Sequence, residues 1–409
     1  MSTIWLSVPN GIRSTHIRIS GSKSETNRAL LLQALYPQIK LENASSSDDS
    51  RAMEMALASG KNVIDVGHAG TAMRFLTAYF AATPGKRTLT GSARMKQRPI
   101  GILVDALREL GGQIEYVDKE GFPPLSIDGQ TLKGGSISVN AGVSSQFLSA
   151  LLLVAPKFEK GLELTLKGKL TSRPYLQMTL SLLEQIGVDT SFSGDVIRIA
   201  HMPSLPINRI PIESDWSSAS YFYSLVALSA IGTSMQLSSF KPSSFQGDRA
   251  VADIYRNFGV MTNFLGDVIH IEKDSQPTVE ALDLNLNDTP DLAQTLAVTC
   301  LGLGIGCRLT GLGTLRIKET DRLRAMQTEL SKFGASVSIT DDSLELSALQ
   351  NLPMDISVST YDDHRMALAF APLAAKVRLS INNPEVVSKS YPEFWEDFKT
   401  MGGVAVKSL

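Results

Sequence analysis

The sequence predicts an α/β protein of two lobes, each built from three β/α modules. Three observations lead to this prediction. A chain of 409 residues is too long for one ordinary domain and favours two or three. Its 43% of apolar and 20% of charged residues are typical of packed, ordered cores. A phrase in which a helical run, a glycine and a β-like run follow one another recurs six times.

The recurring phrase returns about every 70 residues, a period too long and too irregular for a solenoid. Its glycine fits the left-handed position just past a helix end, where a side chain would be strained. The alternation that follows, as in "QIEYV" and "SVSIT", is that of a half-buried strand. The segment "PINRIPIESDWSSAS" interrupts the pattern, so we expect a lobe boundary near Ile212. The six glycines are Gly60, Gly111, Gly187, Gly259, Gly334 and Gly402.

The net charge of −2 gives no overall field that would attract nucleic acid or an anionic membrane. Positive charge that binds an anion must therefore be local. Cys300 and Cys307 lie in an apolar run and are expected to be buried thiols, and the five histidines show no metal-ligand spacing with them. The N-terminus lacks the pattern of a signal peptide, and the longest apolar run is too short to span a bilayer. We therefore expect a cytoplasmic protein.

Small polar and basic residues precede the first apolar helix. The stretch "SGSKSETNRALLLQAL" places Lys23, Ser24 and Arg28 around a helix start near residues 22–24. Hydroxyl groups there can cap unpaired N–H groups, and the helix dipole favours an anion. The spacing is not that of a Walker A loop. A phosphate site and a plainly capped surface helix both fit this stretch.

Two further stretches repeat the arrangement. "GHAGTAMRFLTAYF" has Gly70 at the turn, Thr71 as a candidate cap and Arg74 in the first helical turn. "GSARMKQRPIGILVDALREL" has Arg94 and two more cations ahead of Pro99, which suits a first helical turn. Three cations before a helix start are unfavourable for its dipole unless an anion lies among them. Solvated surface charges are the alternative.

Neutral donors open two more helices. Ser144, Ser145 and Gln146 lead directly into the apolar run "FLSALLLVAP". Ser172 and Tyr175 begin "SRPYLQMTL". Such groups suit sugar-like hydroxyls or phosphate oxygens, although each is explained more simply as a helix cap.

Two charge-dense stretches follow in the second half. In "LRIKETDRLRAM", Lys318 and Arg322 are predicted to share a helical face, and Glu319 can pair with Arg322. A solvated helix start is the plain interpretation; the functional one needs Lys318 near an anion and Glu319 as a proton carrier. The triplet "DHR", which begins at Asp363, precedes an apolar helix and is hard to place without a polar ligand. If the modules converge, these helix starts focus positive potential on one cleft between the lobes and bind a multiply charged small anion.

These phrases, in this order, resemble the enolpyruvyl transferase family, and most closely its 5-enolpyruvylshikimate-3-phosphate (EPSP) synthases. "GSKS…NR", "RMKQRPI", "KETDRL" and "DDHRMA" are the specific ones, and the matching phrases span nearly the whole chain. The resemblance implies a two-lobed inside-out α/β barrel with the active site in the cleft between the lobes. Residues 1–14 and 213–409 would form one lobe, and residues 15–212 the other.

The resemblance also implies a reaction. The family moves the enolpyruvyl group of phosphoenolpyruvate to the 5-hydroxyl of shikimate-3-phosphate and releases phosphate, through a tetrahedral ketal intermediate. It uses no metal or organic cofactor. The two small-molecule substrates are then the expected partners, without nucleic acid or membrane, and the expected state is a monomer.

The family's functional residues map onto this sequence. Asp291 is similar to the base on the attacking hydroxyl, Glu319 beside Lys318 to the proton carrier, and Lys23 to a lysine that reaches both substrates. The residues implied for shikimate-3-phosphate are Lys23, Ser24, Arg28, Ser144, Ser145, Gln146, Ser172, Tyr175, Asp291 and Lys318. Those implied for phosphoenolpyruvate are Lys23, Gly70, Arg94, Gln146, Arg322, Arg365 and Lys389, with His68, Thr71 and Arg74 as further candidates.

Two positions depart from the family pattern. His68 stands where many members have asparagine, and Phe75 where many have proline; the resemblance implies that both flank the phosphoenolpyruvate side. Gly70, next to the site of the family's inhibitor glyphosate, is retained.

Two alternative functions would require other residues. The UDP-N-acetylglucosamine enolpyruvyl transferases share the fold but usually carry a reactive cysteine on the loop that reads "GSARMKQRPI" here. A non-catalytic phosphate-binding module would not need Lys23, Asp291 and Glu319 together.

Overall fold

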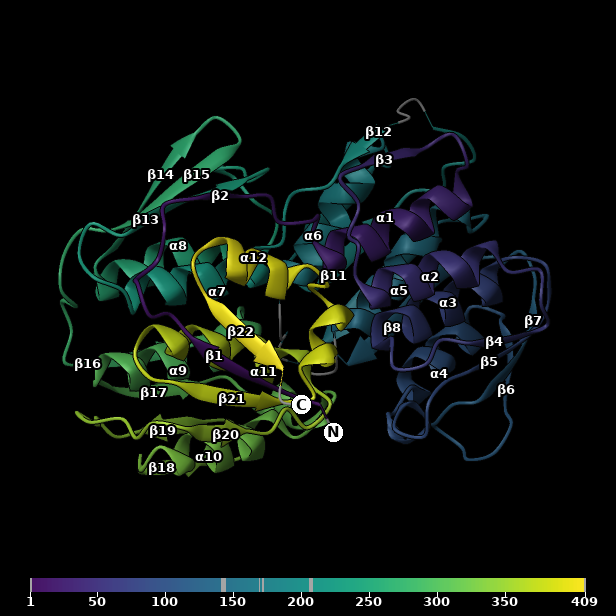
Figure 1. Ribbon diagram of the computed structural model, residues 1–409. Helices are drawn as coiled ribbons and strands as arrows, with labels where there is room; N and C mark the ends of the chain where they lie inside the picture. The colour runs from purple at the N-terminus through teal and green to yellow at the C-terminus, as the bar shows by residue number, and fades with distance from the viewer. Residues whose placement is uncertain (1, 141–144, 169, 171–172, 206–208, 408–409) are drawn as a thin grey trace. The chain divides into compact units, whose positions relative to one another are not determined.

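The computed structural model describes residues 2–140, 145–168, 170, 173–205 and 209–407. They form two compact units of mixed helices and strands (Figure 1). Unit 1 combines Met1–Ser20 with Glu213–Leu409, and unit 2 is Gly21–Ile212. The first boundary follows Ser20 rather than residue 14, because His16–Ile17 (β2) pairs with a strand of unit 1.

Unit 2 contains, within its described residues, two four-stranded sheets and one two-stranded sheet. The first has the order β4 (Val63–Asp65), β5 (Gly85–Thr90), β7 (Leu125–Gly129), β6 (Gln113–Tyr116). The second has the order β8 (Gly135–Asn140), β9 (Leu162–Lys167), β11 (Val196–Ile199), β10 (Thr190–Ser193). In the third, β12 (Arg209–Pro211) and β3 (Lys40–Glu42) are parallel.

Unit 1 contains three four-stranded sheets in its described residues. The first has the order β2 (His16–Ile17), β13 (Ser234–Ser238), β15 (Val268–Lys273), β14 (Val260–Leu265). The second has the order β16 (Ala281–Asn285), β17 (Gly306–Thr310), β19 (Leu344–Leu346), β18 (Val337–Ile339). The third has the order β20 (Ile356–Val358), β21 (Leu379–Asn382), β1 (Thr3–Ser7), β22 (Val404–Lys407).

The four-stranded sheets of both units share one pattern. Each has one parallel pair at one edge, followed by two antiparallel pairs. In the last sheet the N-terminal β1 takes the place of the strand that ends the other modules, and Figure 1 shows it in purple beside the yellow β21 and β22. Five of the six predicted copies of the repeat are therefore found among the described residues, and β1 completes the last of them. The copy at Gly60 instead leads into β4, the edge strand of the first four-stranded sheet.

In four of the five described four-stranded sheets, one helix connects the parallel strands and a second leads to the hairpin. In the fifth, the whole of unit 2 and one helix of unit 1 lie between the parallel strands β2 and β13 in the sequence. In unit 2 the helices are α1 (Lys23–Leu35), α2 (Asp48–Ala58), α3 (Gly70–Ala82), α4 (Gly101–Glu109), α5 (Ser145–Val154) and α6 (Arg173–Gln185). In unit 1 they are α7 (Trp216–Ala227), α8 (Val251–Ile254), α9 (Ala293–Leu303), α10 (Arg322–Lys332), α11 (His364–Phe370) and α12 (Phe394–Thr400).

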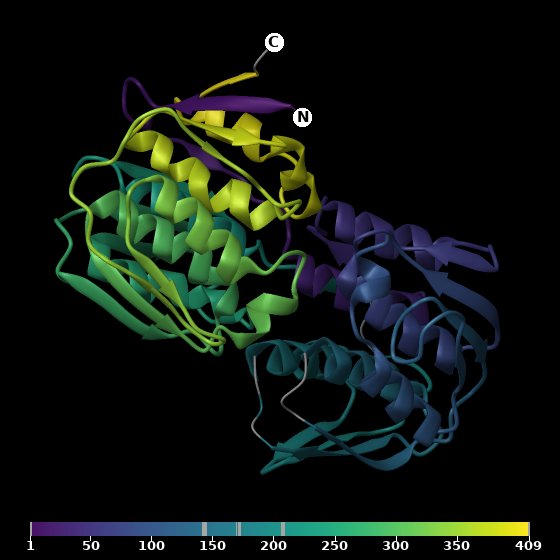
Figure 2. The ribbon, with the colours of Figure 1, turned by 90° about the horizontal axis from the view of Figure 1, so that it is seen from below.

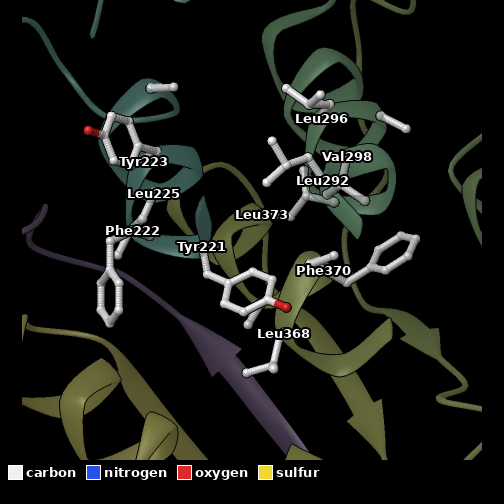
Figure 3. Close-up of a cluster of buried hydrophobic side chains, with 14 of the residues drawn as sticks. Tyr221, Phe222, Tyr223, Leu225, Leu292, Leu296, Val298, Leu368, Phe370 and Leu373 are labelled. Atoms are coloured by element: carbon white, nitrogen blue, oxygen red, sulfur yellow. The ribbon is translucent and has the colours of Figure 1, made fainter. Parts of the chain in front are cut away.

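Each unit has its own apolar core. In unit 1, α9 packs against α7, α10 and α11, and these helices lie next to one another in Figure 2. Side chains of α7, α9 and α11, including Tyr221, Leu296 and Phe370, form part of this core (Figure 3). Cys300 and Cys307 are buried free thiols there, as predicted. Within the described residues, no helix has the length and apolar character needed to cross a membrane.

Local predictions at helix ends had mixed outcomes. Five of the six repeat glycines have positive φ, but Gly60 does not, because α2 ends at Ala58 and the chain leaves it in an extended conformation. Thr71 is not a cap: α3 begins at Gly70, and its N-cap residue makes no side-chain hydrogen bond. Pro99 precedes α4, which begins at Gly101, instead of opening it.

Candidate active site

The chemistry-bearing residues of unit 1 lie where its strands end and its helices begin. Asp291 belongs to the short 3₁₀-helix Pro290–Leu292 before α9, and Arg322 is the first residue of α10. Asp363 is the N-cap of α11, and its side chain accepts a hydrogen bond from the backbone N–H of Arg365. Ion pairs between these helix starts bring their side chains together.

Arg322 binds three carboxylates. Its Nη1 lies 2.9 Å from Oδ1 of Asp291, its Nη2 lies 3.0 Å from Oε2 of Glu319, and its Nε lies 2.7 Å from Oδ2 of Asp363. The Arg322 side chain is 2% exposed. Burial acts to lower the pKa of Arg322, but the carboxylates of Asp363, Glu319 and Asp291 raise it above the ordinary arginine value. The guanidinium fork therefore fixes the directions of both candidate catalytic carboxylates.

A second cation holds Asp291 from the other side. Nη2 of Arg365 lies 3.0 Å from Oδ2 of Asp291 and 3.3 Å from Oγ of Ser217. Ser217 in turn donates to Asp248, which is buried. Burial, and then the negative charge of Asp291, raise the pKa of Asp248 to about 7.

Lys389 completes this network. It closes the 3₁₀-helix Pro384–Lys389, and its Nζ lies 3.1 Å from Oε1 of Glu319. Glu319 is thereby held by two cations, as Asp291 is. Lys318, in contrast, ends the 3₁₀-helix Gly313–Ile317, so it does not share a helical face with Arg322 as the sequence suggested.

In unit 2, the first helix begins as predicted. The side chain of Ser22 caps α1 by accepting from the backbone N–H of Glu25. Lys23 and Ser24 follow in the first turn and are partly exposed. Nζ of Lys23 lies 3.5 Å from Oδ2 of Asp49, in the first turn of α2.

Arg28 is buried one turn further along α1. Its guanidinium donates to Oγ1 of Thr179, to Oγ of Ser149 and to the backbone carbonyls of Ser24 and Tyr175. Burial lowers the pKa of Arg28 to about 10, so it remains a cation at neutral pH. These contacts join α1 to α5 and α6.

The start of α3 contacts a neighbouring loop and α5. Arg74 is buried and donates to the carbonyls of Gly70 and Pro99, and Nε2 of Gln146 lies 3.1 Å from Oγ1 of Thr71. A Cβ on Gly70 would lie 2.4 Å from Nη1 of Arg98, so this turn accepts only glycine without a shift of that side chain.

The remaining candidates of unit 2 lie at other helix starts. His68 Nδ1 lies 3.1 Å from Oγ of Ser92 at the surface. Arg94 is exposed before the 3₁₀-helix Met95–Gln97. Ser145 opens α5 and Tyr175 lies in the first turn of α6, whereas Ser144 and Ser172 lie outside the described residues.

Sequence reasoning overlooked several partners. Asp363 was noted only for its charge at a helix start, without a role in the site. Five further partners were not candidates at all, and these are Ser217, Asp248, Asp49, Ser149 and Thr179. Ser149 and Thr179 carry a usable signal, since each is a hydroxyl on an otherwise apolar helical face, four residues after a site candidate. Among the described residues, no group of three or more His, Cys, Asp or Glu side chains is arranged to hold a metal ion.

Comparison with known proteins decides the family. The family model described as EPSP synthase (3-phosphoshikimate 1-carboxyvinyltransferase) matches residues 54–398, which is most of the chain. This chain belongs to the EPSP synthase family. A 3-phosphoshikimate 1-carboxyvinyltransferase of Bacteroides fragilis is 45% identical over 406 residues, which is 97% of both chains. One from Shewanella pealeana is 38% identical over 416 residues, covering 94% of this chain and 96% of the relative.

A solved EPSP synthase from Acinetobacter baumannii has the same fold. It superposes with a TM-score of 0.81 over 100% of both chains at 21% sequence identity. At that identity the likeness supports the α/β fold, while membership of the EPSP synthase family rests on the sequence matches.

Proposed function

We propose that this chain transfers the enolpyruvyl group of phosphoenolpyruvate to the 5-hydroxyl of shikimate-3-phosphate and releases phosphate. It would thus be a 3-phosphoshikimate 1-carboxyvinyltransferase, as its relatives are named. The observation that carries the proposal is the pair of carboxylates on one guanidinium. Asp291 and Glu319 are both bound by Arg322, and each is also bound by a further cation.

The reaction needs a base and an acid at fixed positions. Asp291 accepts the proton of the 5-hydroxyl as its oxygen attacks C2 of phosphoenolpyruvate, and Glu319 delivers a proton to the C3 methylene. The product of this addition is a tetrahedral ketal. Glu319 then takes back a proton from the new methyl group as phosphate leaves, which restores the enol ether, and the departing phosphate takes the proton held by Asp291. Each proton transfer typically contributes about 10²–10⁴ in rate.

The cations supply the electrostatic part. Arg322, Arg365 and Lys389 would bind the phosphate and carboxylate of phosphoenolpyruvate, together with Gly70, Arg94 and Gln146 of unit 2. Fixed cations that need no reorganisation stabilise the charge that develops in the transition state. The ion pairs also hold Asp291 and Glu319 in fixed positions before substrate arrives.

Shikimate-3-phosphate would bind mainly to unit 2. We assign its phosphate and ring to Lys23, Ser24, Ser145, Gln146 and Tyr175, with Arg28 positioned behind them. Ser144 and Ser172, outside the described residues, belong to this assignment, and Asp291 and Lys318 of unit 1 complete it. Lys23 would serve both substrates.

The two sets of residues must act on one pair of substrates. We propose that the units are the lobes of an inside-out α/β barrel and that they close around the substrates, which excludes water from the ketal. The protein would work as a cytoplasmic monomer, without a metal or an organic cofactor. Support comes from the placement of both sets at helix starts of the same repeated module.

Release of inorganic phosphate from the two substrates tests the proposal. We expect release with shikimate-3-phosphate and phosphoenolpyruvate together, and a loss of about 10²–10⁴ in kcat for Asp291→Asn and for Glu319→Gln. Asp267→Asn and Glu280→Gln, at exposed positions of unit 1, are the matched controls. Release with UDP-N-acetylglucosamine in place of shikimate-3-phosphate, or full activity of both variants, would overturn the assignment.

A further inference from the structure

We infer that Glu329 and Tyr361 are positioning residues, because they lock a strained turn that places Asp363 and Arg365. The inference rests on the proposed function, since it concerns the geometry of the Asp291–Arg322–Arg365 group. Neither residue was a candidate from the sequence.

The strain lies immediately before Asp363. Tyr361 has φ of 54° and Asp362 has φ of 55°, so two successive residues with side chains adopt the left-handed conformation. Such residues rarely do so, and bulky ones least often. Strained backbone persists where surrounding contacts over-determine it, and this occurs often at functional sites.

Glu329 supplies one set of these contacts. It lies on α10, is fully buried, and its Oε1 accepts a hydrogen bond of 2.6 Å from the Tyr361 hydroxyl. Its Oε2 accepts from the backbone N–H of Ser359 at 3.1 Å and from Nζ of Lys332 at 2.6 Å. The buried carboxylate is therefore satisfied by three donors, two of which belong to the turn.

The other strained residue is held separately. Oδ1 of Asp362 accepts from Nδ2 of Asn383 at 2.9 Å, and Asn383 is itself left-handed with φ of 53°. The backbone N–H of Asp363 closes the turn on the carbonyl of Thr360 at 2.9 Å. Both strained residues thus have a side-chain contact to another element.

Helix α10 links the contacts of Glu329 and Tyr361 to the candidate site. Arg322 and Glu329 are seven residues apart on α10, so they lie on one face of the helix. Arg322 binds Asp363 and Glu329 binds Tyr361, so two residues of α10 contact the segment 361–363. Because Arg365 follows within two residues, its reach to Asp291 depends on the path that the turn sets.

The Tyr361 hydroxyl keeps the proton that it donates to Glu329. Burial, and then the hydrogen bond and the charge of Glu329, raise the pKa of Tyr361 to about 12. The phenol therefore remains a donor throughout the pH range in which an enzyme of this kind would be assayed.

The experiment compares Tyr361→Phe with Tyr255→Phe. Both remove a hydroxyl that makes a hydrogen bond in unit 1, but Tyr255 bonds Thr299, away from the ion-pair network. We expect Tyr361→Phe to lower kcat or raise the KM for phosphoenolpyruvate by roughly tenfold, with the KM for shikimate-3-phosphate little changed. Tyr255→Phe should lower the melting temperature similarly and leave all three parameters unchanged.

Asp362 provides the conservative variant. Asp362→Asn keeps an oxygen acceptor and a residue that tolerates the left-handed conformation, so it should retain activity, whereas Asp362→Ala should not. Unchanged kinetics in Tyr361→Phe, or equal losses in both Asp362 variants, would overturn the inference while wild-type activity still supports the proposed function. A wild-type protein that releases no phosphate would overturn both.

Discussion

Nε of Arg322 lies 2.7 Å from Oδ2 of Asp363, and both side chains are almost completely buried. A buried ion pair is costly to break, because the partner that remains is an unpaired charge away from water. The same guanidinium also binds Asp291 and Glu319, so breaking the pair would disturb the positions of these two carboxylates as well as the fold.

We expect Arg322→Lys to lose both activity and stability. A lysine cannot present the planar fork that binds three carboxylates at once, although it keeps the charge. Activity should fall by more than about a hundredfold, and the free energy of unfolding by about 3–5 kcal/mol if the pair is broken. Phosphate release and thermal melting measure these effects. Arg308→Lys, at an exposed arginine paired with Asp283 and Glu345, is the control and should change little.

The buried carboxyl of Asp248 predicts a pH dependence of stability. Its pKa in the folded protein is about 7, above its ordinary value of 3.8, so the folded state holds a proton that the unfolded state releases. Stability contributed by this group is therefore present at low pH and is lost as pH rises from about 4 to about 7.

Asp248→Asn should remove the loss of folding stability that accompanies this rise in pH. Relative to wild type, the variant should gain stability on going from pH 4.5 to pH 8, by at most about 4 kcal/mol for a shift of this size. Melting temperatures of both proteins across this range provide the measurement, with Asp267→Asn as an exposed control. Parallel pH curves for the variant and wild type would show that Asp248 does not titrate in this range.

The sequence best predicted the features that depend on a few neighbouring residues. Ser22 caps α1 as its position suggested, since a cap depends on only four successive residues. The repeat was also readable, because every copy needs the same helix end and the same alternation. Gly60 was misassigned since its helix, α2, ends without a left-handed residue, and the glycine alone does not distinguish these endings.

The contacts across modules could not be predicted in this way. Arg322 was a candidate for binding an anion, yet its partner Asp363 lies 41 residues further along the chain. Asp49 beside Lys23, and Ser149 beside Arg28, are likewise distant in sequence. Such pairs depend on how one module packs on the next, which a single sequence does not encode in any short pattern. The left-handed turn at Tyr361 is also hidden, because neither residue in it is glycine.

We expect Phe75 to affect the binding of shikimate-3-phosphate through its contact with Arg28. The guanidinium carbon of Arg28 lies 5.4 Å from the centre of the fully buried Phe75 ring and 5.8 Å from that of Tyr175. A cation over a ring gains about 0.5–2 kcal/mol, so Phe75→Leu should raise the KM for shikimate-3-phosphate roughly 2- to 30-fold. Phe80→Leu, on the same helix but away from Arg28, is the control. A rise confined to the KM for phosphoenolpyruvate would instead place Phe75 with the other substrate.

Two repeat glycines should differ sharply in their tolerance of alanine. Gly259 has φ of 73°, and a Cβ there would lie 2.1 Å from the carbonyl oxygen of Ser275, so Gly259→Ala must move backbone. The left-handed conformation alone costs about 1–2 kcal/mol, and the clash adds to it. Gly60 lacks positive φ, and a Cβ there would meet no atom within 4 Å. Gly60→Ala should therefore be neutral or stabilise by up to about 1 kcal/mol, through the lower entropy of the unfolded chain. Chemical denaturation of the two variants makes the comparison, and equal destabilisation would show that the helix end at Gly60 needs glycine after all.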